Sequence, residues 1–315
     1  MKRYSVIRTH TSPYQVRGFK DLEKKCLEKL PLDYLYSVEE IKADSEIIVV
    51  TNTHTKFEDL PSEIREKARL IVHPNSGYEN FASSFSELKN LPVVIGHEIR
   101  AQAVAEYTLS CFVDYWTRRP HHPNWDQSRL YPRKLMNKTS ALIIGHGHIG
   151  KRLKTMLSSL GVHVKTVDPR LPADYKELSE VKESFETIIL AASLNSQSIH
   201  LINQQSLQKL APSVLINPSR GGFINEVDLM NYLKNSSMTA YLDVFEKEPL
   251  PEGSLKHERL IKTSHIAGVH QDLDQDIINF EFQVISDFLN LSEKDYMVKY
   301  HHQLLANKWF QGELW

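Results

Sequence analysis

The chain has 315 residues, of which 41% are hydrophobic, and this is enough for two domains with substantial cores. Its 38 Lys and Arg residues balance 39 Asp and Glu residues, and no run of like charges marks a nucleic-acid arm or a membrane patch. We therefore expect a small molecule as the partner, with no nucleic acid and no membrane.

The N-terminal stretch contains the strand-like YSVIR, and no apolar region typical of a signal peptide follows it. No uninterrupted apolar run is long enough to span a bilayer. The only cysteines, Cys26 and Cys111, lie far apart in the sequence and indicate neither a disulfide framework nor a cysteine metal site. These features favour a reducing, cytoplasmic compartment.

Apolar runs alternate with helical segments in the first half of the chain. The runs SEIIVV (45–50), ARLIVH (68–73) and LPVVIG (91–96) predict strands, and FEDLPSEIREKA predicts a short helix between the first two. Residues 102–116 are apolar nearly all round and predict a buried helix. The proline-rich RRPHHPNW after them is interpreted as a domain boundary.

Six further apolar runs occupy the second half of the chain. They are SALIIG, HVKTVD, ETIILAA, SVLINP, TAYLDV and RLIKTS. Because helical segments or loops separate them, they predict a second α/β unit with a parallel sheet.

The stretch ALIIGHGHIG (141–150) contains the pattern G-x-G-x-x-G between a predicted strand and the amphipathic segment IGKRLKTMLSSLG. The next strand ends in Asp168, about 20 residues further on, as a dinucleotide site requires. Gly145 would permit the tight turn, Gly147 the approach of a pyrophosphate and Gly150 close packing of the helix. The helix N-terminus would attract the phosphates.

The acidic residue also bears on the choice of dinucleotide. Asp168 would accept hydrogen bonds from the adenosine ribose and repel a 2′-phosphate, so NAD is favoured over NADP. Arg170 would favour NADP instead, because it could bind a 2′-phosphate. The alternative for the whole motif is a glycine-rich turn that binds another ligand, such as the methyl donor of a methyltransferase.

Polar residues follow three later strands, where ligands bind in an open α/β sheet. They lie in NPSRGGFIN (217–225), YLDVFEKEPLP (241–251) and TSHIAG (263–268). A histidine can exchange a proton with an alcohol, a carboxylate can orient it, and an arginine can bind a carboxylate. His265, Glu248 and Arg220 supply these groups. Taken singly, Arg220 could merely tie a loop to the sheet, and Glu248 could be a turn residue.

Five motifs in this order resemble those of the D-isomer-specific 2-hydroxyacid dehydrogenases. They are GHGHIG, TVDPR, NPSRGG, LDVFEKEP and SHIAG, within a resemblance that runs from about Asp44 to Ala267. The resemblance implies an α/β protein with two Rossmann-like or flavodoxin-like domains, doubly wound parallel sheets and an interdomain cleft. It implies a substrate domain of residues 1–98 and 270–315 and an NAD-binding domain of residues 99–269.

The resemblance further implies hydride transfer between NAD(H) and C2 of a D-2-hydroxy acid or its 2-oxo acid. His265 would be the general acid/base, and Glu248 would orient it. Arg220 would polarise the substrate carbonyl and bind the substrate carboxylate. Asp243 matches the aspartate that binds the nicotinamide carboxamide.

Upstream, NSGYEN matches the family loop whose N–H groups hold the substrate carboxylate, which gives Ser76 and Gly77 that role. In GHEIRAQAVAE, Arg100 lies near a position that is close to the substrate in the family, where a small or polar residue is usual. This predicts a substrate with a second anion, a phosphate or a carboxylate. QAVAEY matches the long helix that commonly contributes to a dimer interface, so a homodimer is expected.

The full set implied for the cofactor is Gly145, Gly147, His148, Ile149, Gly150, Asp168, Pro169, Arg170 and Asp243. Two departures from the family stand out. His148 replaces the usual arginine beside the pyrophosphate, and Ala191 and Ser193 replace the usual His and Pro of the cofactor-facing wall. The adjacent histidine pairs, 121–122 and 301–302, lack the spacing of ligands, so no metal is expected. A rival function is an NAD(H)-sensing, corepressor-like dimer with little turnover.

Overall fold

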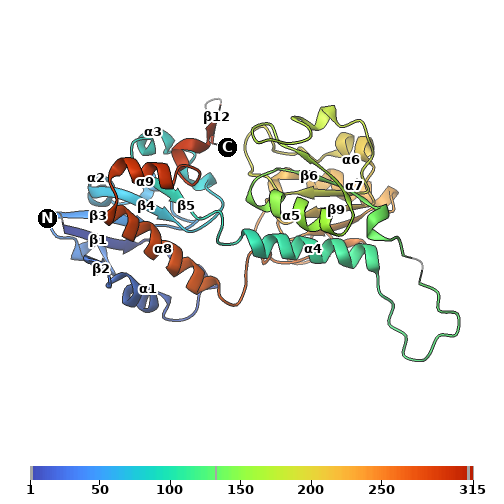
Figure 1. The fold of residues 1–315 in the computed structure, drawn as a ribbon, viewed down its shortest axis with the longest axis horizontal. Coiled ribbons are helices and arrows are strands. Elements are labelled where there is room, and N and C mark those ends of the chain that lie inside the picture. Colours follow the sequence, from blue (N-terminus) through green and yellow to red (C-terminus); the bar gives the residue numbers. More distant parts are fainter. Residues whose placement is uncertain (1–2, 132, 311–312, 315) are drawn as a thin grey trace. The chain divides into compact units, whose positions relative to one another are not determined.

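The computed structural model describes residues 3–131, 133–310 and 313–314. The chain divides into two compact units (Figure 1). Unit 1 comprises residues 1–100 and 270–315, and unit 2 comprises residues 101–269. No described helix is both long enough and apolar enough to cross a membrane.

Unit 1 contains a five-stranded parallel sheet in the order β2-β1-β3-β4-β5. Its strands are β1 (Arg3–Arg8), β2 (Leu32–Leu35), β3 (Ser45–Val50), β4 (Ala68–His73) and β5 (Val93–Ile95). The strand order reverses between β1 and β3, and open α/β sheets bind ligands beyond the carboxyl ends of the strands at such a reversal.

Helices cover both faces of this sheet because neighbouring side chains of a strand point to opposite sides. They are α1 (Phe19–Leu27), α2 (Ser62–Lys67), α3 (Phe85–Leu88), α8 (Leu273–Asn290) and α9 (Glu293–Lys299). Ile47 belongs to the core that includes α2 and α3, whereas its neighbour Ile48 belongs to the core that includes α1, α8 and α9. Shorter elements are η1 (Val38–Glu40), η2 (Phe57–Asp59), η3 (Glu79–Phe81), η7 (Leu305–Lys308) and the antiparallel pair β12 (Trp309–Phe310) and β13 (Glu313–Leu314).

Unit 2 contains a six-stranded parallel sheet in the order β11-β10-β9-β8-β6-β7. Its strands are β6 (Ser140–Ile144), β7 (His163–Val167), β8 (Thr187–Leu190), β9 (Val214–Asn217), β10 (Thr239–Leu242) and β11 (Leu260–Lys262). An isolated parallel bridge joins Val167 to Tyr175 beyond β7, at the position of the third strand in a dinucleotide-binding sheet. The order reverses between β6 and β8, so the glycine loop after β6 lies at the reversal.

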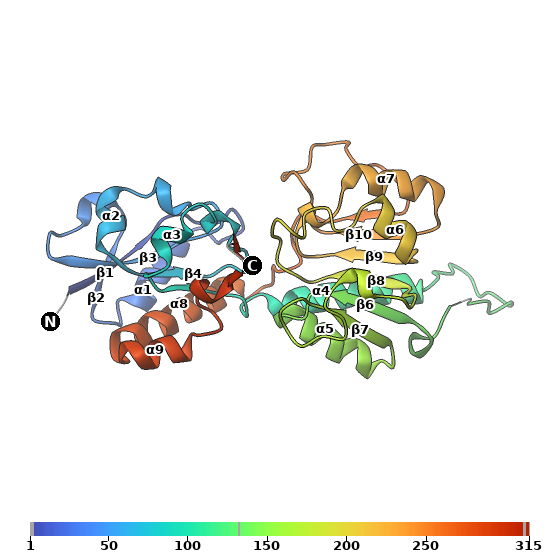
Figure 2. The ribbon, with the colours of Figure 1, turned by 90° about the horizontal axis from the view of Figure 1, so that it is seen from above.

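The helices of unit 2 also form two layers, with α4 and α5 on one face of the sheet and α6 and α7 on the other (Figure 2). They are α4 (Ala101–Thr117), α5 (His148–Ser159), α6 (Gln204–Leu210) and α7 (Glu226–Asn235), with the short η4 (Met136–Lys138), η5 (Leu178–Glu180) and η6 (Gly221–Phe223). Ile143 packs in the core with α4 and α5, and Ile144 packs in the core with α6 and α7.

The predicted α/β class with two doubly wound parallel sheets is confirmed, and two local expectations are wrong. RRPHHPNW is not a domain boundary, because the residues before and after it belong to unit 2. Its prolines follow the end of α4 and begin an exposed connection. The helix expected to be buried all round is α4, and its Gln102, Glu106 and Ser110 are exposed.

Candidate active site

The glycine loop joins β6 to α5, and its three glycines have different surroundings. Gly145 has a φ of 104°, and a Cβ at this position would lie 2.5 Å from the carbonyl oxygen of Ala191. A Cβ at Gly150 would lie 2.0 Å from the oxygen of Gly145. At Gly147, which caps the N-terminus of α5, a Cβ would meet nothing within 4 Å. Unfilled space therefore adjoins a helix N-terminus, an arrangement that fits a dinucleotide pyrophosphate.

Asp168 follows β7 and connects that strand end to the glycine loop. Its buried carboxylate accepts hydrogen bonds from the backbone N–H groups of His146 at 2.8 Å, Arg170 at 2.9 Å and Leu171 at 2.8 Å. A ring nitrogen of His146 also bonds the carbonyl oxygen of Pro172. The negative charge is thus fixed beside the loop, where an adenosine ribose binds in dinucleotide-binding folds.

The other residues implied for the cofactor lie on the same two connections. His148 is the first residue of α5, and Ile149 packs in the core with α4 and α5. After β7, Pro169 is exposed and Arg170 is partly buried.

Asp243 follows β10 and is fully buried. One carboxylate oxygen accepts from the Ile266 N–H at 2.8 Å and from the Thr263 hydroxyl at 2.6 Å, and the other accepts from the Ala267 N–H at 2.8 Å. Its carbonyl oxygen accepts from the His265 N–H at 2.7 Å. Asp243 therefore holds the whole segment that carries His265.

Two further residues extend this network, and sequence reasoning missed both. The hydroxyl of Tyr107 on α4 lies 2.6 Å from the hydroxyl of Thr263. Because Thr263 donates its proton to Asp243, Tyr107 is the donor of the pair. Burial raises the pKa of Tyr107, so the phenol stays protonated and keeps this role. The only sequence signal was for Thr263, a polar residue at the end of a predicted strand.

His265 has a φ of 55°, a left-handed conformation that is uncommon outside glycine and that the bonds to Asp243 maintain. Its Nδ1 lies 2.7 Å from Oε2 of Glu248, and Oε1 of Glu248 accepts from the Phe245 N–H at 3.0 Å. Burial works to raise the pKa of Glu248, but the bonds from His265 and Phe245 and the charge of Arg220 lower it overall. The ionised carboxylate accepts only, so Nδ1 of His265 carries a proton and Nε2 is left for another partner.

Arg220 follows β9 on a turn that Asn217 shapes. The Asn217 side chain accepts from the N–H and hydroxyl of Ser219 and donates to the Arg220 carbonyl oxygen at 2.9 Å. A Cβ at Gly221 would lie 1.8 Å from the carbonyl carbon of Phe245, so this turn packs directly on the segment that leads to Glu248. The structure brings Arg220, Glu248 and His265 together at one edge of the unit 2 sheet, and Asn217 was not predicted.

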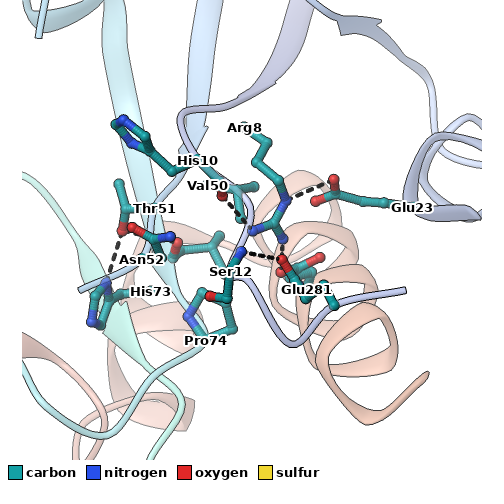
Figure 3. Close-up of polar contacts among 12 residues, drawn as sticks. Arg8, His10, Ser12, Glu23, Val50, Thr51, Asn52, His73, Pro74 and Glu281 are labelled. Carbon is teal, nitrogen blue, oxygen red and sulfur yellow. Dashed lines mark hydrogen bonds and ion pairs between the residues drawn. The ribbon is translucent and has the colours of Figure 1, made fainter. Parts of the chain in front are cut away.

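In unit 1, Ser76 and Gly77 follow β4 on a loop that His73 organises. His73 is fully buried, with Nε2 2.7 Å from the Gly77 carbonyl oxygen and Nδ1 2.9 Å from the Thr51 hydroxyl (Figure 3). Its ring also packs edge-to-face on Phe81 at 5.0 Å. Because the Gly77 carbonyl only accepts, Nε2 of His73 donates, and this bond holds the loop against the end of β4. Sequence reasoning did not find His73.

Arg100 and Arg8 both lie at this end of unit 1, and they differ in their partners. Arg100 donates to the Pro74 carbonyl oxygen and to the Tyr14 hydroxyl. Arg8, at the end of β1, pairs with Glu23 at 2.8 Å and with Glu281 (Figure 3). Burial works to lower the pKa of Arg8, but the two carboxylates raise it overall, so its charge is permanent and compensated.

This chain matches the model of a known protein family. The D-isomer specific 2-hydroxyacid dehydrogenase NAD binding domain matches residues 108–267. This chain belongs to that family. It is 31% identical to an (S)-sulfolactate dehydrogenase of Chromohalobacter salexigens over 239 residues, which cover 68% of this chain and 74% of the relative. It is 27% identical to a hydroxypyruvate reductase of Thermotoga maritima, with 71% and 76% covered.

A solved structure agrees at the level of the fold. D-lactate dehydrogenase from Aquifex aeolicus, complexed with NAD and lactic acid, has a TM-score of 0.71 at 18% identity and covers 96% of this chain and 99% of its own. The chain is thus an NAD-dependent oxidoreductase that transfers hydride between NAD(H) and C2 of a D-2-hydroxy acid or 2-oxo acid. The predicted family, fold, activity and NAD cofactor are confirmed. These relatives give the corepressor-like alternative no support.

Proposed function

We propose that His265 exchanges the hydroxyl proton of the substrate at Nε2 while Glu248 holds the proton on Nδ1. The observation that carries this proposal is the 2.7 Å pair of these side chains, which are 51% and 35% exposed. In reduction, the imidazolium donates its Nε2 proton to the oxygen that becomes the hydroxyl, and in oxidation the neutral ring takes that proton back. NAD, when bound, supplies the hydride acceptor or donor.

The remaining residues bind and orient the substrate and the cofactor. In unit 2, Arg220 polarises the carbonyl and binds the substrate carboxylate, and Asp243 both holds the His265 segment and contacts the nicotinamide carboxamide. In unit 1, the N–H groups of Ser76 and Gly77 hold the carboxylate. Their main contribution is to hold the reacting atoms in a productive geometry.

Asp168 gives the cofactor preference, NAD over NADP. Its charge is held beside the glycine loop by three N–H groups, so a 2′-phosphate at the ribose would meet a fixed carboxylate. His148, with Ile149 and the glycines, contacts the pyrophosphate, and its contact strengthens when the ring is protonated. Pro169 and Arg170 border the adenosine.

The test is a panel of 2-oxo acids assayed with NADH and NADPH in parallel. We expect oxidation of NADH with at least one of them, a lower kcat/KM with NADPH, and a loss of about 10²- to 10⁴-fold in His265→Gln. No turnover on the whole panel, or an unchanged rate in that variant, would overturn the proposal. Dimerisation driven by NADH without turnover would support the regulatory alternative instead.

We also propose a cytoplasmic homodimer. The segment after α4 exposes large apolar side chains, with Trp125 and Leu130 both 73% exposed, and such side chains commonly mark an interface. The free thiols of Cys26 and Cys111 suit a reducing compartment. Light scattering on the purified protein should give twice the monomer mass, and Trp125→Ser with Leu130→Ser should shift it to the monomer. A wild-type monomer would contradict the dimer.

A further inference from the structure

We propose that Arg100 selects 2-oxo acids that carry a second anionic group, a carboxylate, sulfonate or phosphate, in addition to the carboxylate next to the carbonyl. This inference rests on the proposed function, because it assigns a substrate class to the same substrate-binding loop.

The first observation is the position of Arg100. Its guanidinium donates to the carbonyl oxygen of Pro74, at the start of the loop that carries Ser76 and Gly77. A Cβ at Gly96 would lie 2.9 Å from Cα of Pro74, so the chain after β5 runs directly against this loop. The bond therefore places a cation beside the amides that we assign to the substrate carboxylate.

The second observation is that no carboxylate among the residues that the structure describes compensates the charge. Arg100 makes no ion pair with any residue that the structure describes, although it is partly buried. The contrast with Arg8 is direct, since Arg8 lies between Glu23 and Glu281 (Figure 3). Partial burial of an uncompensated charge is unfavourable unless a partner arrives, so the arrangement favours an anionic ligand over a neutral one.

The third observation is that the guanidinium of Arg100 has more N–H donors than its described acceptors use. A guanidinium has five N–H donors, and those of Arg100 reach two neutral acceptors, the Pro74 carbonyl and the Tyr14 hydroxyl at 2.8 Å. The guanidinium also lies over the Tyr14 ring, 5.8 Å from its centroid. These contacts orient the planar group without neutralising it, and the remaining donors suit the oxygens of a carboxylate, sulfonate or phosphate.

Tyr14 belongs to the connection that follows β1, at the reversal of strand order in unit 1. Its side chain is 45% exposed, so it is not held by a core and its hydroxyl is ordered by Arg100. We therefore assign Tyr14 as the residue that positions the guanidinium, and expect its phenol to act through Arg100.

The experiment compares matched substrates in the purified full chain with NADH. Pyruvate is paired with 3-sulfopyruvate, and hydroxypyruvate with 3-phosphohydroxypyruvate, so that each pair differs by one anionic group. In the wild type we expect kcat/KM to be at least tenfold higher for one dianion than for its partner, mostly through KM. Arg100→Met should lower this ratio by about 10- to 100-fold, the value of a charge-assisted hydrogen-bonded contact.

Two further variants separate specificity from a general effect. Tyr14→Phe should lower the ratio by a few-fold, because the guanidinium loses one orienting partner but keeps its charge. Arg17→Met is the matched control, since Arg17 is an exposed arginine in the same connection. It removes the same charge and should leave the ratio unchanged, and a fall equal to that of Arg100→Met would refute a specific role.

The possible failures are distinguishable. If the wild type has the same kcat/KM for pyruvate and hydroxypyruvate as for the two dianions, the dehydrogenase activity is supported and the proposed role of Arg100 is refuted. If Arg100→Met lowers kcat/KM equally for both members of a pair, Arg100 only supports the loop at Pro74, and the inference is again refuted. If no 2-oxo acid is reduced although NADH binds, the proposed function itself fails.

Discussion

Replacing Glu248 with Gln tests how the carboxylate controls His265. Glu248 uses one oxygen for the Phe245 N–H and the other for Nδ1 of His265, whereas Gln has a single oxygen. In the variant, an NH₂ group must face either the Phe245 N–H or Nδ1, and in neither pairing does a negative charge face the imidazolium. The 2.7 Å charge-assisted bond is worth about 1.5–3 kcal/mol in a buried setting. Because both groups are partly exposed, we reduce it to about 1–2 kcal/mol.

That energy corresponds to a factor of about 5–30 in rate. In the reduction direction, where the imidazolium donates the proton, kcat/KM should fall by that factor. Oxidation, which needs the neutral ring, should suffer less. Glu246→Gln is the control, since Glu246 lies in the same segment but pairs with His200. A kcat/KM of Glu248→Gln equal to that of the wild type, or equal losses in both directions, would refute this reasoning.

Three other changes have defined outcomes. In Gly150→Ala the new methyl group would lie 2.0 Å from the Gly145 oxygen, so the loop must shift, and fluorescence titration should show NADH affinity at least tenfold lower; unaltered affinity would contradict the packing argument. Asp168→Asn should raise kcat/KM with NADPH relative to NADH by roughly tenfold, because the fixed charge is lost. An unchanged ratio would exclude Asp168 as the source of the preference for NAD. For Glu281, burial raises the pKa well above 4.5 in the folded state, so its contribution to stability is present below that pH and is lost as pH rises. Between pH 5 and 8, the free energy of unfolding measured with urea should therefore fall less in Glu281→Gln than in the wild type. An equal fall in both proteins would argue against this role of Glu281.

The parts of the fold that sequence patterns predict are those with strong apolar runs. The runs at 45–50 and 68–73 coincide with β3 and β4, because central parallel strands are covered on both faces and are therefore mostly apolar. β2 escaped prediction because it is a short edge strand whose first residues, Leu32 and Asp33, are only partly buried. The family resemblance places residues 270–315 in the substrate domain, but no helix or strand is predicted within them. In the structure, α8 and α9 of this segment cover one face of the unit 1 sheet.

Within the site, the sequence predicts groups that end strands but not the contacts that hold them. His265, Glu248 and Arg220 stand in motifs of recognisable chemistry, and the sheet collects them at one edge. His73 and Asn217 are single polar residues at strand ends, with no pattern to distinguish them from satisfied core polar groups. Their importance becomes visible only when tertiary contacts show which carbonyl groups they bind.

The polar residues of the site are of two kinds: buried residues that hold loops, and exposed residues that we assign to proton transfer. Asp243 and His73 are fully buried, and each hydrogen-bonds the backbone of a functional loop. His265 and Glu248, which we assign to chemistry, are exposed enough to meet a substrate. A buried donor or acceptor that loses its partner costs about 1–3 kcal/mol, so the loops are held in place by the penalty of releasing these groups. The left-handed backbone of His265 can persist for the same reason, since the bonds to Asp243 oppose its relaxation. Orientation of the exposed proton-transfer group therefore depends on the buried side chain and backbone of Asp243.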